Sequence, residues 1–164
     1  MATNEMRAWR SGVGPGRVNL IGDHTDYNQG LALPMAIGLE VAVTFEPRSD
    51  QRIEITSDSY PGERASIPLV VGVDTIGDME PAWARLAAAV VSLARPGSGG
   101  LVHVASTVPR GSGLSSSAAL AVALADVFGV EGDAQVLARL CQAAEHRIGV
   151  PVGLMDPLVC AGGR

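Results

Sequence analysis

The side chains best suited to chemistry gather first in the segment GPGRVNLIGDHTDYNQG. Its polar centre is the run Asp23, His24, Thr25 and Asp26, and Arg17 lies a few positions before that run. A sugar presents many hydroxyl groups, each a donor and an acceptor at once, and carboxylates with an imidazole can satisfy them directionally. The segment is therefore either a polar turn between two strands or a pocket for a ligand rich in hydroxyl groups.

A second candidate site is the loop PRGSGLSSS, residues 109–117. Its glycines let backbone N–H groups approach a ligand closely, and its serines lie where a helix is expected to begin. The unpaired N–H groups of a helix N-terminus suit phosphate oxygens. The candidate phosphate-binding residues are Gly111, Ser112, Gly113, Leu114, Ser115, Ser116 and Ser117. A serine N-cap after an ordinary glycine turn has the same pattern, so the residue types alone leave both interpretations open.

Two carboxylates are the remaining candidates. Glu145 falls about 100° from the centre of the apolar stripe of its expected helix, at the edge of the buried face. A carboxylate partly out of water needs a partner, either an arginine or a cation such as Mg²⁺, which a serine hydroxyl can also ligate. Asp156 follows a glycine and two large apolar residues in GLMDP. We expect it to face inward, as a helix cap or as a base.

Apolar runs and alternating patterns predict the strands that must position these residues. We expect a strand at residues 31–45, interrupted near Pro34 and Gly38, because proline and glycine weaken a strand interior. A half-exposed strand at residues 52–58 should pair with it. ASIPLVVGV is a weaker strand, and residues 100–108 form another.

Helices are expected after these strands. One has Pro81 in its first turn and stops at a Pro-Gly pair. The next runs from about Ser116 to Phe128 and ends at Gly129, and a third has Asp133 as its N-cap. The apolar stripe of the third consists of Val136, Leu137, Leu140, Cys141, Ala144 and Ile148. Strands and helices alternate irregularly, which predicts an α+β domain of two layers.

Composition restricts the classes of protein that fit. The chain has 164 residues, is 47% hydrophobic and carries a net charge of −5, which suits one globular domain. The absence of a basic run argues against nucleic-acid binding, and no apolar run approaches the roughly 20 residues that span a bilayer. Cys141 and Cys160 fit reduced core residues of a cytoplasmic protein. All 12 basic residues are arginine, so the chain lacks the lysine of a P-loop, a protein kinase or Schiff-base chemistry.

Three segments, taken together and in this order, resemble the galactokinase branch of the GHMP small-molecule kinases. GRVNLIGDHTDY is similar to the galactokinase signature, and PRGSGLSSSAAL to the phosphate-binding motif shared across the family. CQAAEHRIGVPVGLMD resembles the family segment that carries a metal-binding glutamate and a catalytic aspartate. The resemblance covers the chain from about Gly14 to its last residue.

The resemblance implies ATP-dependent phosphorylation of galactose at its anomeric hydroxyl. It implies that Asp156 is the base and that Arg17 stabilises transition-state charge and holds the base as its anion. It assigns the sugar site to Asp23, His24, Thr25 and Asp26, the ATP phosphates to residues 111–117, and Mg²⁺ to Ser117 and Glu145. Galactose and ATP would be the partners, with no nucleic acid and no membrane; the oligomeric state is left open.

The implied fold is the GHMP kinase N-terminal domain, which resembles the second domain of ribosomal protein S5. We expect residues 1–10 to be a frayed terminus and residues 11–164 to be this domain, cut short at its C-terminal end. The ferredoxin-like C-terminal domain of the family and its third glycine-rich motif are not found in the sequence, so we expect these 164 residues to be inactive by themselves. Asp23 stands where the family usually has glutamate, Pro157 stands where it has glutamine, and the interval from Glu145 to Asp156 is one residue short.

Other functions fit the same motifs. A GHMP kinase for another small alcohol, such as N-acetylgalactosamine, arabinose or mevalonate, would share most of them. A galactose sensor that binds sugar and ATP without turnover is an alternative of a different class, although Arg17 and Asp156 count against it. A purely structural module is a further alternative.

Overall fold

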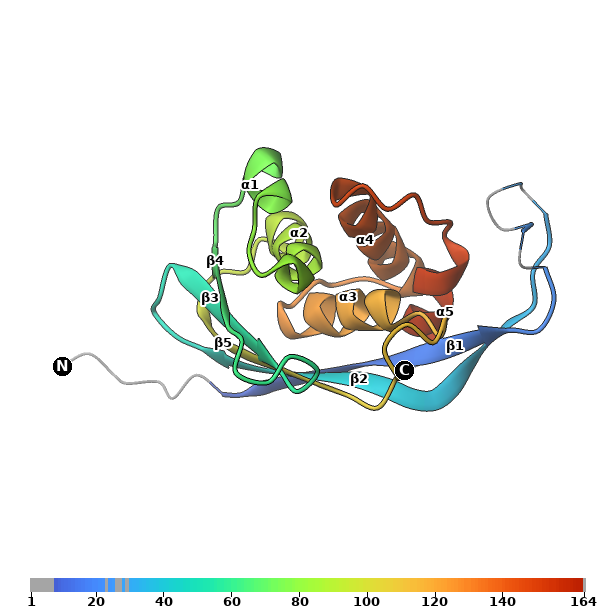
Figure 1. Ribbon diagram of the computed structural model, residues 1–164, viewed down its shortest axis with the longest axis horizontal. Coiled ribbons are helices and arrows are strands. Elements are labelled where there is room, and N and C mark those ends of the chain that lie inside the picture. The colour runs from blue at the N-terminus through green and yellow to red at the C-terminus, as the bar shows by residue number, and fades with distance from the viewer. Residues whose placement is uncertain (1–7, 23, 26–27, 29, 164) are drawn as a thin grey trace.

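A five-stranded mixed sheet with helices on one of its faces makes up the computed structural model, which describes residues 8–22, 24–25, 28 and 30–163 (Figure 1). The strands are β1 (Arg10–Asn19), β2 (Pro34–Pro47), β3 (Arg52–Ser57), β4 (Ala65–Pro68) and β5 (Gly100–Ser106). The helices are α1 (Val73–Gly77), the 3₁₀ turn η2 (Ala82–Ala84), α2 (Arg85–Ala94), α3 (Ser116–Val127), α4 (Ala134–Arg147) and α5 (Met155–Gly162). This arrangement confirms the expected α+β class.

The strand order β1-β2-β5-β3-β4 corrects the expected pairing of β3 with β2. β5 lies between them, antiparallel to β2 and parallel to β3, with Val102 opposite both Phe45 and Ile55. Strands adjacent in sequence often pair, but here the later strand β5 buries alternate residues and accepts a neighbour on each side. The link from β3 to β5 runs through β4, α1, η2 and α2, a long crossover of the kind that a parallel pair requires.

The interruption expected near Gly38 is a β-bulge within one continuous strand. Pro15 of β1 pairs with Glu40 and Arg17 pairs with Ala36, so residues 37–39 of β2 lie opposite a single residue of β1. Pro34 is the first residue of β2, a position where its missing N–H is tolerated. Bulges bend a strand and redirect nearby side chains, and this one lies immediately before Arg17.

Sequence patterns did not predict β1 as a strand, because its glycines and proline disfavour one. The glycines serve a tertiary contact instead, since the backbone of α3 lies directly on this strand. A Cβ at Gly14 would stand 2.0 Å from the carbonyl oxygen of Ala119, and one at Gly12 would stand 2.6 Å from that of Ala123. Residues 1–7 lie outside the described residues, and β1 begins at Arg10, one residue before the expected domain boundary.

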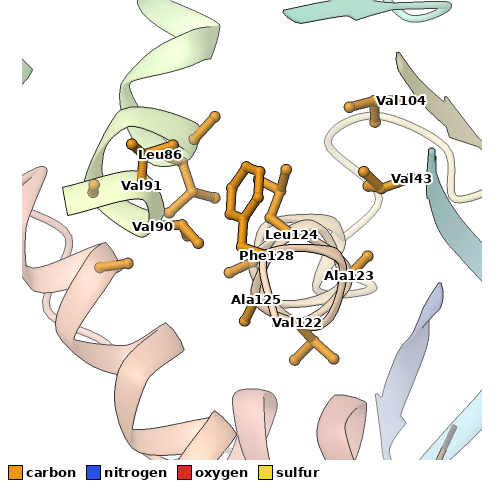
Figure 2. Packing of buried hydrophobic residues seen from close by; sticks show 14 of the residues in the cluster. Val43, Leu86, Val90, Val91, Val104, Val122, Ala123, Leu124, Ala125 and Phe128 are labelled. Carbon is orange, nitrogen blue, oxygen red and sulfur yellow. The ribbon is translucent and has the colours of Figure 1, made fainter. Parts of the chain in front are cut away.

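The core lies between the sheet and the helices, with α3 at its centre (Figure 2). Of the 12 residues of α3 the buried ones are Ala118, Ala119, Ala121, Val122, Ala123, Leu124, Ala125 and Val127, so this helix is apolar all round. Phe128, at its C-terminal end, meets Phe45 of β2 edge-on with 5.5 Å between ring centres.

The helix predictions are confirmed in position. Asp133 caps α4, since its Oδ1 accepts hydrogen bonds from the backbone N–H groups of Gln135 and Val136, both at 2.9 Å. Leu137 of the expected stripe is buried, whereas Val136 is 47% exposed. α4, with 14 residues, is the longest of the described helices, and none of them is long and apolar enough to cross a bilayer.

Candidate active site

Residues from separate elements meet at the N-terminal end of α3. Arg17 comes from the end of β1, and its backbone N–H donates to the carbonyl of Leu114 in the glycine-serine loop at 3.1 Å. The close contact of α3 with β1 sets this distance, because a Cβ at Gly16 would lie 3.0 Å from the same carbonyl oxygen. α4 brings Glu145 and the first turn of α5 brings Asp156 to the same region.

Arg17 and Asp156 form a bidentate ion pair. Nε of Arg17 donates to Oδ1 of Asp156 at 2.6 Å, and Nη2 donates to Oδ2 at 2.5 Å. The third nitrogen, Nη1, donates to the carbonyl of Gly113 at 2.7 Å. The side chains of Arg17 and Asp156 are only 15% and 25% exposed, so solvent screens the pair weakly. Bidentate arginine–carboxylate pairs fix geometry as well as charge, so the orientation of the Asp156 carboxylate is set relative to the loop.

Asp156 also bonds directly to the loop. The hydroxyl of Ser115 donates to Oδ2 of Asp156 at 2.5 Å. Ser115 is the N-cap residue of α3 but has φ 59° and ψ 42°, and its side chain makes no capping hydrogen bond. Asp156 was expected to face inward as a cap or as a base, and it lies, partly buried, in the first turn of α5.

Glu145 lies deeper than the edge position expected from the helical wheel, with only 3% of its surface exposed. The hydroxyl of Ser117 donates to its Oε1 at 3.2 Å. Burial raises the pKa of Glu145, the Ser117 hydrogen bond lowers it, and the nearby Asp156 carboxylate raises it further. Among the described residues no salt bridge joins Glu145 to an arginine. A cation would relieve the cost of ionising this carboxylate.

The loop itself is open to solvent. Gly111 and Gly113 have φ values of 66° and 72°, which favour glycine, and nothing lies within 4 Å of a Cβ built at either position. The hydroxyl of Ser112 donates to the carbonyl of Pro109 at 2.7 Å and closes the turn. The loop therefore leaves room for a ligand next to the first N–H groups of α3.

A cavity of about 200 Å³ adjoins this loop, and Ser116 and Ser117 form part of its wall. Tyr60 and Trp83 stack beside it, with 5.1 Å between ring centres and 13° between ring planes. The guanidinium of Arg110 lies 4.3 Å above the Tyr60 ring. Flat aromatic rings next to the glycine-serine loop suit a ligand in which a planar base is attached to phosphate groups.

Residues 14–30, the candidate sugar-binding segment, are described in part. Asp23 and Asp26 lie outside the described residues. His24 is exposed, and its backbone carbonyl accepts a hydrogen bond from Asn28 Nδ2 at 2.7 Å. Oγ1 of Thr25 lies 2.6 Å from the carbonyl oxygen of Leu31 and 2.8 Å from that of Gly22, so its proton holds the turn closed.

Two family models match the chain. The GHMP kinases N terminal domain matches residues 82–164, half of the chain, and the galactokinase galactose-binding signature matches residues 7–47. The chain belongs to the GHMP kinases. The matched ranges include every site residue expected from the sequence, but not Tyr60.

Individual relatives of this GHMP kinase chain are galactokinases. Those of Canis lupus familiaris and Homo sapiens are 41% and 39% identical to it over 160 residues, or 92% of this chain. The Mycobacterium tuberculosis galactokinase is 42% identical over 158 residues, 91% of this chain. The chain spans about two fifths of their lengths, at 41%, 41% and 42%.

Solved structures show the same fold. Lactococcus lactis galactokinase complexed with galactose has a TM-score of 0.79 and 26% identity, covering 94% of this chain and 42% of that one. Methanococcus jannaschii mevalonate kinase, at 18% identity, has a TM-score of 0.76 over 94% of this chain and 51% of its own. The second likeness concerns the fold alone.

Sequence reasoning missed Tyr60 and Trp83, which line the cavity, and included Arg110 only as part of the loop of residues 109–117. Tyr60 and Trp83 lie far apart in the sequence and carry no motif. One signal was present, because the chain has only two tryptophans, two tyrosines and two phenylalanines. In a chain with so few aromatic residues, each one is a candidate for contact with a planar ligand.

Proposed function

We propose that the protein containing this chain transfers the γ-phosphoryl group of ATP to the anomeric hydroxyl of galactose. The observation that carries the proposal is the Arg17–Asp156 pair, held by the carbonyl of Gly113 and the hydroxyl of Ser115 at the start of α3. The match of residues 7–47 to a galactose-binding signature supports galactose over other alcohols. We assign residues 11–164 to a single domain that carries these groups.

Phosphoryl transfer depends mainly on positioning and on charge stabilisation. Asp156 accepts the proton of the sugar hydroxyl as that oxygen attacks the γ-phosphorus. The guanidinium of Arg17, 2.5 Å from the Asp156 carboxylate, places a fixed positive charge beside the transferring group. The N–H groups at the start of α3 and the glycines of the loop hold phosphate oxygens. Asp23, His24 and Asp26 receive sugar hydroxyls, and the Thr25 hydroxyl bonds to the carbonyls of Gly22 and Leu31 nearby in the chain.

Ser117 and Glu145 would hold Mg²⁺, and their oxygen atoms suit this hard cation. When bound, the ion would neutralise negative charge on the phosphate groups. Within the described part of the chain, no group of three or more His, Cys, Asp or Glu side chains is arranged to hold a metal. Mg²⁺ typically uses one or two protein carboxylates and takes its other ligands from phosphates and water.

The aromatic rings of Tyr60 and Trp83 line the cavity beside the loop, where the adenine base would lie. Their cavity shares Ser116 and Ser117 with the start of α3, so a base there and phosphates at the helix N-terminus belong to one ligand. Base–aromatic stacking tolerates many bases, so this surface supports nucleotide binding in general.

A coupled ATP-consumption assay across a panel of acceptors tests the proposal, with the full-length gene product beside the 164-residue chain. The panel contains galactose, N-acetylgalactosamine, arabinose and mevalonate. We expect galactose to give the highest kcat/KM in the full-length protein. Asp156→Asn should lower turnover by about 10²–10⁴-fold, the usual contribution of a general base, while calorimetry shows galactose and ATP still bound.

Each contrary result has a definite meaning. A preference for another alcohol identifies a different GHMP kinase. Binding of sugar and ATP without turnover by the full-length protein identifies a sensor. Asp156→Asn activity above about a tenth of wild type removes Asp156 from the base role, because that residual rate exceeds what a lost base allows.

A further inference from the structure

Ser115 occupies an unusual position for a serine. An N-cap residue normally has extended backbone angles, and its side chain accepts a hydrogen bond from an N–H of the first helical turn. Ser115 has the left-handed angles φ 59° and ψ 42° and makes no such bond. Of the described residues other than glycine, Arg95 alone shares a positive φ, and it ends α2, where left-handed residues are common.

The left-handed backbone directs the Ser115 hydroxyl out of its own helix. The carbonyl of Ser115 still accepts the N–H of Ala119 at 3.0 Å, so α3 begins normally. The side chain, however, donates to Oδ2 of Asp156 on α5 at 2.5 Å. Strained non-glycine residues persist where surrounding contacts hold them, often at functional sites. The contact that accounts for this one is the hydrogen bond to Asp156.

The hydrogen bonds to Asp156 are distributed unequally between its oxygens. A carboxylate has about two acceptor positions on each oxygen. Oδ2 receives two donors, Arg17 Nη2 at 2.5 Å and the Ser115 hydroxyl at 2.5 Å. Oδ1 receives Arg17 Nε at 2.6 Å. Among the hydrogen bonds of the described residues, Oδ2 is therefore filled and Oδ1 keeps one acceptor position.

We propose that Ser115 is a positioning residue for Asp156, and that its hydroxyl fills Oδ2 so that the substrate proton is delivered to Oδ1. The inference rests on the proposed function, because it concerns the base of that reaction. Since Ser115 does not cap α3, the first N–H groups of the helix also stay available for phosphate oxygens. The backbone N–H groups of the loop therefore bind the phosphates of ATP, while the Ser115 hydroxyl bonds to the base, Asp156.

The test compares Ser115→Ala and Ser115→Gly in the full-length protein. Both remove the hydroxyl, and glycine also removes the left-handed strain. We expect kcat to fall about 10- to 100-fold in both variants, the loss typical of one hydrogen bond to a charged group. The dissociation constants of galactose and ATP should change less than about 2-fold. Ser115→Gly should keep a thermal midpoint at or above wild type, which separates positioning from folding.

Ser66→Ala is the matched control. The Ser66 hydroxyl also donates to a carboxylate, that of Glu54, and accepts from an arginine, Arg52, at 2.7 Å, but on β3 and β4 away from the site. Its removal should leave kcat unchanged. A double variant adds a second readout: if Ser115 acts through Asp156, Ser115→Ala should cost nothing further in an Asp156→Asn background.

Four results overturn the inference. Wild-type kcat in Ser115→Ala rejects it while the proposed function stands. Losses that multiply in the double variant, or weaker ATP binding with kcat intact, show that the hydroxyl contacts phosphate instead. No turnover of any alcohol by the wild-type full-length protein rejects the proposed function, and this inference with it.

Discussion

Gly14→Ala tests the contact on which the position of the whole site depends. A Cβ at Gly14 would lie 2.0 Å from the carbonyl oxygen of Ala119 and 2.7 Å and 2.8 Å from two further backbone atoms of the same residue. Cβ contacts under 3.0 Å are essentially never seen, so β1 and α3 would have to separate by about 1 Å. A helix backbone cannot rotate away as a side chain can.

The expected loss in the free energy of unfolding is at the upper end of the range for overpacked cores. Adding a methyl group to a well-packed core costs about 1–3 kcal/mol, and we expect about 3 kcal/mol because backbone must move. For a chain of this size, each kcal/mol lowers the melting temperature by about 2–4 °C, so the midpoint should fall by about 6–12 °C. Urea unfolding of the 164-residue chain, followed by circular dichroism, measures the free energy directly.

Gly38→Ala supplies the control. Gly38 also lies in a strand, but nothing is within 4 Å of its Cβ position and its φ is not in the left-handed region. Alanine there should be neutral or stabilise by up to about 1 kcal/mol, because it reduces the entropy of the unfolded chain. If Gly14→Ala unfolds within 1 kcal/mol of Gly38→Ala, the contact between β1 and α3 is looser than described and the reasoning fails.

Further predictions concern Glu145, the thiols and the aromatic cavity. Because burial raises the pKa of Glu145 above its ordinary 4.5, stability from this group is full below pH 4.5 and is lost as pH rises through the folded-state value. Glu145→Gln should thus be more stable than wild type at pH 8 and equal to it at pH 4 in urea unfolding; a gain independent of pH would contradict this. Burial raises the pKa of Cys160 to about 12, so native protein should resist thiol reagents at pH 8 and react when denatured; rapid labelling of the native form would disprove it. Trp83→Ala should weaken ATP binding about 5- to 100-fold with galactose binding kept, whereas Trp9→Ala, at an exposed tryptophan, should change neither; equal effects would reject the base site.

Sequence rules correctly predicted the helix starts and caps, because these depend on residues close together in the chain. Asp133 caps α4 as expected, and α3 begins at Ser116 after the glycine-serine loop. Long-range packing decided the rest. β3 pairs with β5, whose partner residues lie 47 positions later in the sequence, as Val102 does for Ile55, so no local pattern could reveal the pairing.

The candidate site shows the same division. Residue types marked the glycine-serine loop and both carboxylates as candidates, and the family resemblance gave them their expected roles. The burial of Glu145 could not be predicted, because α3 and α5 pack on α4 from other parts of the chain. The link from Ser115 to Asp156 depends on a left-handed residue that no propensity scale assigns to serine. The glycines of β1 disfavour a strand by propensity, and their role becomes evident only from their contact with α3.

The Arg17–Asp156 pair has a consequence for synthesis of the chain on the ribosome. Its two residues are 139 positions apart in the sequence. At about 5–20 residues per second, Asp156 is made roughly 7 to 28 seconds after Arg17. Throughout that interval the guanidinium has no carboxylate from α5 to hold. A nascent chain stalled before α5 would therefore contain Arg17 and the glycine-serine loop, yet lack the carboxylate that bonds to both Arg17 and Ser115.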